Sequence, residues 1–160
     1  MSMADWVYLE DFDVWATHAN SPCYINALER KHATQLLCVD FLHLQDYELL
    51  EKSLNVADIV YFGGVESIID DLKRMAQKAQ NTIFVLTLGA SGSLAFKGSR
   101  MYTQAVLPLK KVVDTTGCGD AFQAGFTACY YRNQDISEAL LSGAELGRKA
   151  AMNYGGVPWS

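Results

Sequence analysis

Short apolar runs alternate with longer amphipathic stretches through the first half of the chain. Four of these runs are rich in β-branched and aromatic residues and are almost continuously apolar, which is typical of strands covered on both faces. They are residues 6–12, 35–41, 58–62 and 82–87. Strands that alternate with helices in this way favour βαβ units. The pattern therefore predicts an α/β protein with a mainly parallel sheet.

The stretches between these runs predict helices, because their apolar residues recur at helical spacing, as Ile68 and Leu72 do. The predicted helices cover residues 22–32, 45–54, 65–80, 119–131 and about 135–152. Two short β-like runs punctuated by glycines, residues 93–97 and 100–106, predict an antiparallel hairpin at an edge of the sheet. The chain has no internal repeat, low-complexity tract or linker. We therefore expect residues 1–160 to form a single domain.

The composition is that of a globular protein, with 50% hydrophobic and 19% charged residues. The net charge of −5 gives no electrostatic footprint for binding nucleic acid or an anionic membrane. No two of the four cysteines have the two-residue spacing of a zinc knuckle or a redox pair. No apolar run approaches the roughly 20 residues of a membrane helix, and the start of the chain lacks a signal-type stretch. We expect a reduced, cytoplasmic protein.

The segment Asp114-Thr115-Thr116-Gly117-Cys118-Gly119-Asp120-Ala121-Phe122-Gln123-Ala124-Gly125-Phe126 carries the candidate chemistry. Its glycine-bounded turn opens directly into a predicted helix, where unpaired N–H groups at the positive end of the helix dipole favour an anion. Asp120 lies in the first turn, where its carboxylate is placed to accept a proton. A general base beside a turn that binds phosphate suits phosphoryl transfer. The alternative is that Asp120 caps the helix and the glycines only form a turn.

The whole segment resembles the second signature of the ribokinase-like sugar kinases, the PfkB carbohydrate kinase family. The resemblance implies an α/β three-layer sandwich, with ATP and Mg²⁺ as cofactors. It also implies that Asp120 is the catalytic base and that the amides of Gly117, Cys118 and Gly119 form the anion hole. Cys118 stands where alanine is common in the family. Two interpretations of Cys118 are open. The helix N-terminus lowers the pKa of its thiol, or Cys118 is simply a small residue that faces the phosphate.

Other positions extend the resemblance to a nucleotide site. Thr87-Leu88-Gly89-Ala90-Ser91-Gly92 resembles the family's loop that holds nucleotide phosphates, which implies nucleotide-binding roles for Thr87, Gly89 and Gly92. The same loop is otherwise a tight turn. The end of the last predicted helix resembles the wall of the adenine pocket, with Asn153 as a candidate contact.

The cation sites of the family are matched only in part. Asp114 and Thr116 correspond to residues near a monovalent-cation site, which implies a bound K⁺, although Asp114 has the alternative role of capping the loop. Glu66 matches the glutamate of an Asn-x-x-Glu motif that helps to bind Mg²⁺, through water, but Gly63 replaces the asparagine. Asp40 likewise lacks the asparagine of an Asp-x-Asn motif. With these departures and the ending Tyr-Gly-Gly-Val-Pro-Trp, the sequence is more similar to the fructosamine-kinase branch of the family than to a typical ribokinase.

Family members are about twice as long as this chain. The resemblance covers nearly all 160 residues, but only the nucleotide-binding and catalytic C-terminal half of the fold. The resemblance implies that the N-terminal half, with most of the sugar pocket and the β-lid, is missing. We therefore expect a homo-oligomer, or association through the surface that the missing half would cover.

Two functions follow. The first is an ATP-dependent kinase that acts on a hydroxyl of a sugar or sugar derivative, a small-molecule substrate. The second is a truncated nucleotide-binding fragment without catalysis of its own. A dinucleotide-binding dehydrogenase is excluded, because Phe122 stands where its motif needs a third glycine.

Overall fold

The computed structural model describes residues 2–42 and 47–155. The main elements, in chain order, are α1 (Met3–Glu10), β1 (Val14–His18), α2 (Tyr24–Arg30), β2 (Leu36–Asp40), α3 (Tyr47–Ser53), β3 (Ile59–Gly63), α4 (Ile69–Lys78), β4 (Ile83–Thr87), β5 (Ser93–Lys97), β6 (Arg100–Gln104), α5 (Cys118–Asn133) and α6 (Ile136–Ala150). Two short 3-10 helices, η1 (Glu66–Ile68) and η2 (Gly89–Ser91), follow β3 and β4.

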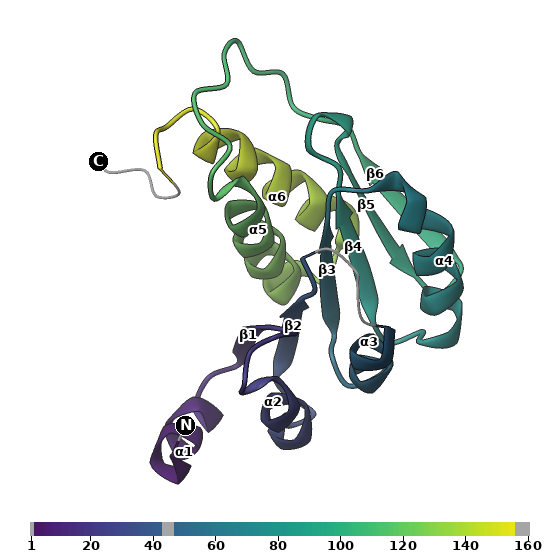
Figure 1. Ribbon diagram of the computed structural model, residues 1–160, viewed down its shortest axis with the longest axis vertical. Helices are drawn as coiled ribbons and strands as arrows, with labels where there is room; N and C mark the ends of the chain where they lie inside the picture. The colour runs from purple at the N-terminus through teal and green to yellow at the C-terminus, as the bar shows by residue number, and fades with distance from the viewer. Residues whose placement is uncertain (1, 43–46, 156–160) are drawn as a thin grey trace.

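The six strands form one sheet in chain order, β1-β2-β3-β4-β5-β6 (Figure 1). Strands β1 to β4 are parallel to one another, with Val14 opposite Leu36 at the start of the first pair. β5 and β6 are antiparallel to their neighbours and end the sheet as a hairpin. The mainly parallel sheet and the edge hairpin that the sequence predicts are therefore confirmed.

Helices cover both faces of the sheet, as Figure 1 shows for α4 on one side and α5 with α6 on the other. Side chains that alternate along each strand enter two separate cores. On β3, Val60 and Phe62 pack with α2, α3 and α4, whereas Ile59 and Tyr61 pack with α5 and α6. The three-layer sandwich expected from the resemblance is thus the observed architecture.

The close approach of α5 and α6 places the first turn of α5 at the sheet. A Cβ added at Gly125 would lie 2.8 Å from the carbonyl oxygen of Ser142, and one at Gly143 would lie 2.9 Å from that of Phe122. Because glycine has no side chain, the two helices can pack backbone against backbone at these points. This contact fixes α5 against α6, which in turn packs on β5 and β6.

The strand predicted over residues 6–12 is wrong, because α1 occupies most of this range. Its start is a capping box, in which Ser2 accepts from the amide of Asp5 and the Asp5 carboxylate accepts from the amide of Ser2. The run of apolar residues reflects burial of Trp6 against Trp15, with ring centroids 5.9 Å apart, rather than a strand. The strand β1, which the sequence analysis missed, follows α1.

Other predicted elements differ only at their ends. The start of the predicted helix 45–54 and the Gly156–Trp159 part of the chain ending lie outside the described residues. Within the two described ranges, no helix combines the length and the apolar character needed to cross a bilayer.

Candidate functional site

Parallel strands end at one edge of the sheet, and the first turn of α5 lies at that edge. Two cavities flank it. The β1–α5 cavity lies between strands β1 to β3 and α5 and includes Asp120 in its lining. The α5–α6 cavity lies between the loops after β4 and β6 and the two helices, and includes Gly119. Neighbouring residues of one helical turn therefore face different cavities.

The α5–α6 cavity has a volume of about 350 Å³. It brings together the predicted nucleotide-loop residues Thr87, Gly89 and Gly92 with Cys118 and Gly119 of α5, from separate parts of the chain. Apolar residues form another part of its wall. They are Val106, Leu107, Leu109, Val112 and Ala151. A cavity with a glycine-rich polar part and an apolar part suits a ligand with charged and aromatic portions.

The turn before α5 exposes backbone donors. Gly117 is the N-cap residue and has a left-handed conformation, with φ 74°. The amide of Cys118 donates to the carbonyl oxygen of Thr115 at 3.2 Å. The amides of Gly117 and Gly119 have no partner within residues 2–42 and 47–155. These two N–H groups and the dipole of a 16-residue helix favour an anion here.

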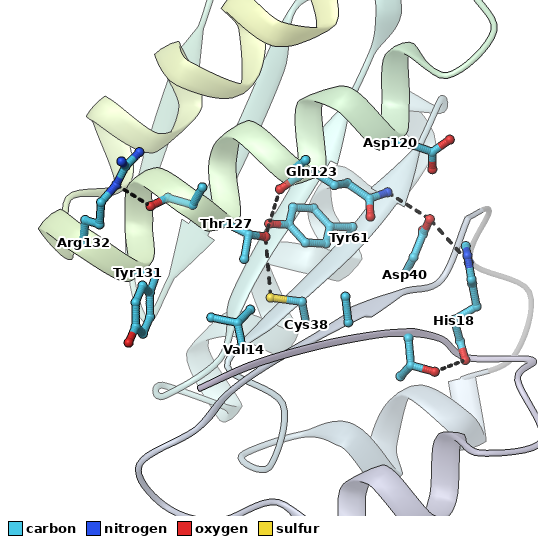
Figure 2. A pocket seen from close by; sticks show the side chains of 14 residues that line it. Val14, His18, Cys38, Asp40, Tyr61, Asp120, Gln123, Thr127, Tyr131 and Arg132 are labelled. Atoms are coloured by element: carbon cyan, nitrogen blue, oxygen red, sulfur yellow. Dashed lines mark hydrogen bonds and ion pairs between the residues drawn. The ribbon is translucent and has the colours of Figure 1, made fainter. Parts of the chain in front are cut away.

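The β1–α5 cavity has a volume of about 640 Å³ and holds a chain of polar side chains (Figure 2). Gln123 Nε2 donates to Asp40 Oδ2 at 2.9 Å, and His18 Nδ1 lies 3.6 Å from the same oxygen. The other oxygen of Asp40 accepts from the amide of Leu42 at 2.7 Å. Asp120 stands clear of this chain in Figure 2 and its side chain is exposed. Its carboxylate is therefore available to a ligand in the cavity.

Three buried or half-buried groups line the cavity beside this chain. The hydroxyl groups of Tyr61 and Thr127 are 2.7 Å apart, and the Cys38 thiol lies 3.6 Å from the Thr127 hydroxyl. Burial raises the pKa of Cys38 to about 12 and the pKa of Tyr61 well above its ordinary value of 10.0. Both groups are neutral at physiological pH. Asp40 and Asp120 are the acidic side chains among the described residues that line the cavity.

Asp114 ties the turn before α5 to the end of the chain after α6. One carboxylate oxygen accepts from the amide of Thr116 at 2.9 Å and from its hydroxyl at 2.8 Å. The other accepts from the amide of Gly155 at 3.0 Å. These hydrogen bonds, with the Thr116 amide first, lower the pKa of Asp114. The two residues expected at the monovalent-cation site are therefore in contact with each other.

Five predicted site residues do not line either cavity: Asp114, Thr116 and Gly117 of the turn before α5, and Glu66 and Asn153. Glu66 is exposed at the start of η1, and Asn153 is exposed and donates to the carbonyl oxygen of Lys149 at 2.8 Å. Neither is among the residues that line the cavities. In the described ranges, no group of three or more His, Cys, Asp and Glu side chains is arranged to hold a metal ion.

The lowered pKa considered for the Cys118 thiol is wrong. Burial, followed by the nearby Asp114 carboxylate, raises the pKa of this thiol. Cys118 lines the α5–α6 cavity as a neutral small side chain, which is the other interpretation of the sequence.

The sequence assigned no role to several residues of both cavities. His18, Asp40 and Gln123 form the polar chain of the β1–α5 cavity, and Ser93 and Arg148 line the α5–α6 cavity. Gln123 lies in the segment that resembles the family signature and Asp40 in the incomplete Asp-x-Asn motif. Position was a further signal, because polar residues at the carboxyl ends of parallel strands commonly line a site. Asp40 ends β2, and His18 ends the strand β1 that was not predicted.

Comparisons with known proteins cover most of the chain. The pfkB family carbohydrate kinase profile matches residues 8–158. The chain is 27% identical to fructoselysine 6-kinase of Escherichia coli (strain K12), over 97% of this chain and 60% of that protein. This relative agrees with the sub-branch that the sequence resembles.

Solved structures show the same fold. An adenosine kinase from Schistosoma mansoni, in complex with 2-fluoroadenosine, has a TM-score of 0.82 at 19% identity, over 99% of this chain and 56% of that one. A fructokinase from Vibrio cholerae, with fructose, ADP and a potassium ion bound, has a TM-score of 0.72 at 22% identity, over 89% of this chain and 55% of that one. The chain thus spans little more than half the length of these proteins. It belongs to the pfkB family of carbohydrate kinases and has the ribokinase-like fold.

Proposed function

We propose that this chain supplies the nucleotide-binding and catalytic half of an ATP-dependent kinase that phosphorylates a hydroxyl group of a sugar or sugar derivative. One observation carries the proposal. The first turn of α5 separates two cavities, with Gly119 in the wall of one and Asp120 in the wall of the other. A phosphoryl group that leaves a nucleotide in the α5–α6 cavity for a hydroxyl in the β1–α5 cavity must pass this turn.

The residues of the turn have distinct roles in this reaction. Asp120 accepts the proton of the attacking hydroxyl, because its exposed carboxylate faces the β1–α5 cavity. The amides of Gly117 and Gly119 stabilise negative charge on the transferred phosphoryl group, with the help of the α5 dipole. The Cys118 amide joins them only if it gives up its bond to Thr115.

The same geometry favours ATP as the phosphoryl donor. In this proposal Thr87, Gly89 and Gly92 hold its phosphates and the apolar wall holds the adenine; their shared position in the lining of one cavity supports it. The proposed contact between Asn153 and the adenine remains a prediction.

The described side chains do not by themselves form a magnesium site. Glu66 is exposed outside both cavities, and no described cluster offers three metal-ligating side chains. Mg²⁺ commonly binds through substrate phosphates and several waters. We therefore expect Mg²⁺ to enter with the nucleotide, and Glu66 remains a candidate contact through water.

The expected monovalent cation would lie near Asp114 and Thr116. The V. cholerae fructokinase structure contains a potassium ion. In this chain the Asp114 carboxylate already accepts three hydrogen bonds from Thr116 and Gly155. We assign no step to K⁺, and its binding near Asp114 and Thr116 remains a prediction.

Titration calorimetry with a non-hydrolysable ATP analogue and Mg²⁺ tests the proposal, with two variants beside the wild type. A Cβ added at Gly119 meets no heavy atom within 4 Å, so Gly119→Val fits the fold but fills the cavity. We expect it to lose binding with an unchanged unfolding temperature. Asp120→Asn should keep binding, while phosphoryl transfer falls about 10²- to 10⁴-fold. Wild-type activity that survives in Asp120→Asn would contradict the role of the base.

A second candidate function is nucleotide binding without transfer. It is favoured by the share of the relatives that the chain covers, 60% of the fructoselysine kinase and 56% of the adenosine kinase. The expected result is binding of ATP with no transfer to any sugar.

The remaining expectations about the protein belong to this proposal. Self-association would use strand β1, which ends the sheet among the described strands and carries exposed Ala16 and half-buried Val14 beside the β1–α5 cavity. Light scattering that shows only monomers would contradict it. A cytoplasmic location is also part of the proposal.

A further inference from the structure

The α5–α6 cavity contains two polar atoms that the proposed roles of the glycine loops leave unexplained. Ser93 Oγ, at the start of β5, and Nε of Arg148, on α6, are buried and have no hydrogen-bond partner within the part of the chain that the structure describes. Ser93 is only 4% exposed. A buried donor without a partner is costly, so native proteins rarely retain one without a reason. Both side chains line the same cavity, which suggests that the missing acceptor is a ligand.

Arg148 is placed close to the first turn of α5. It shares the cavity-facing side of α6 with Ala144 and Ala151, at helical spacing. The adjacent Gly147 packs on α5, where an added Cβ would lie 3.3 Å from the carbonyl oxygen of Cys118. The backbone of Arg148 is therefore one residue from the contact between α6 and the turn that faces the proposed phosphoryl group.

The charge of Arg148 is also unmatched. It is the one Lys, Arg, Asp or Glu among the described residues that line the α5–α6 cavity. Glu145, one turn earlier on α6, is exposed and makes no ion pair with it. A guanidinium carries five donors and no acceptor, and it pairs best with a carboxylate or phosphate.

We propose that Arg148, assisted by Ser93, binds the phosphate chain of the donor nucleotide. This inference rests on the proposed function, because it takes the nucleotide to occupy the α5–α6 cavity. The phosphates offer charged oxygen acceptors, whereas an adenine ring has no carbonyl oxygen and presents only nitrogen acceptors. Arg148 thus brings a full positive charge to the phosphates, whereas the backbone amides of α5 bring only partial charges. It is a binding and positioning residue and takes no proton.

The experiment compares ATP, AMP and adenosine as ligands of the wild type, Arg148→Met and Lys149→Gln. Lys149 is the matched control, because it is the neighbouring cation on α6 but is exposed and outside the cavity. We expect Arg148→Met to weaken ATP binding about 10- to 100-fold, as for loss of a hydrogen-bonded charge. Adenosine binding should change less than about twofold, and Lys149→Gln should leave both ligands within that range. Ser93→Ala should weaken ATP binding by a smaller factor, about threefold.

Protein stability separates this role from a structural one. Met replaces Arg148 with an apolar chain of similar length and removes an unsatisfied donor, so the unliganded variant should unfold at or above the wild-type temperature. If Arg148→Met does not fold, Arg148→Lys provides the same comparison, because it keeps the charge but loses the planar fork. We expect that variant to show an intermediate loss for ATP and none for adenosine.

The outcomes discriminate between the two proposals. Equal losses for ATP and adenosine would overturn the inference and place Arg148 at the base or ribose. Unchanged ATP binding in Arg148→Met, with normal wild-type binding, would also overturn it while leaving the proposed function intact. Failure of the wild type to bind ATP, or binding that persists in Gly119→Val, would instead overturn the proposed function and the inference with it.

Discussion

Gly92 offers a prediction whose magnitude is set by the backbone. Its φ and ψ are 91° and −143°, a conformation that is costly for residues with a side chain. An added Cβ would lie 2.3 Å from the carbonyl oxygen of Gln104 and 3.1 Å from the amide nitrogen of Val106. Both neighbours are backbone atoms, so the clash cannot be relieved by rotating a side chain. Gly92→Ala must therefore displace the end of β6, the loop after β4, or both.

Two costs add in this variant. The backbone conformation costs about 1–3 kcal/mol, and forcing an atom into a filled space costs about 1–3 kcal/mol. We expect Gly92→Ala to lower the free energy of unfolding by about 2–6 kcal/mol, a large part of the about 5–15 kcal/mol that is usual for a domain. In urea, with a slope of about 2 kcal/mol/M, the unfolding midpoint should fall by about 1–3 M.

Gly98 is the matched control, because it also has a positive φ, 56°, but an added Cβ meets no heavy atom within 4 Å. In Gly98→Ala only the left-handed conformation is unfavourable, and the reduced freedom of the unfolded chain partly offsets it. We expect this variant to lower the free energy of unfolding by about 1 kcal/mol or less. If Gly92→Ala cost no more than Gly98→Ala, the close approach of the two loops would not be what holds the cavity wall, and the argument would be refuted.

Three further predictions concern other parts of the chain. Gly143→Ala should separate α5 from α6, because its Cβ would lie 2.9 Å from the carbonyl oxygen of Phe122. Thermal unfolding should show a free energy of unfolding lower by about 1–3 kcal/mol, and an unchanged unfolding temperature would contradict this packing. Tyr61 should ionise above its ordinary value of 10.0 in a spectroscopic titration, because burial raises its pKa. Its contribution to stability is complete below the unfolded value of 10.0 and is lost as the pH rises through the higher folded pKa. The carboxyl of Asp114 should titrate below 3.8 by NMR, because hydrogen bonds led by that from the Thr116 amide lower its pKa; its stabilising effect is present above 3.8 and disappears as the pH falls through the lower folded pKa. A midpoint at or above 3.8 would mean that the hydrogen bonds from Thr116 and Gly155 do not persist in solution.

The central strands were predictable because they are buried on both faces. β2, β3 and β4 each carry a nearly unbroken apolar run, and such a run has few alternatives in an α/β chain. The first element failed for the opposite reason. Around Trp6 the apolar run resembles a strand, and only the Ser2–Asp5 capping box indicates a helix. β1 was not predicted, because buried and exposed residues do not alternate regularly along this strand at the edge of the sheet.

The candidate site was predictable only where one continuous segment builds it. Gly117 to Asp120 are contiguous, so their arrangement follows from the local turn and the start of α5. Ser93 and Arg148 are 55 residues apart in the chain, and they line the same cavity only through the packing of α6 over the hairpin and against α5. No local pattern encodes that arrangement, which depends on the glycines between α5 and α6.

The order of strands in the sheet has a consequence for how the site comes into being. Each strand lies beside the strand that precedes it in the chain, so the sheet can grow step by step from either end without a later strand being inserted. The site cannot grow in this way, because Gln123 of α5 meets Asp40 across 83 residues of chain. It is completed only when the last two helices dock. A partly folded chain that keeps its sheet would therefore have neither cavity, and ligand binding would report on the final step of folding.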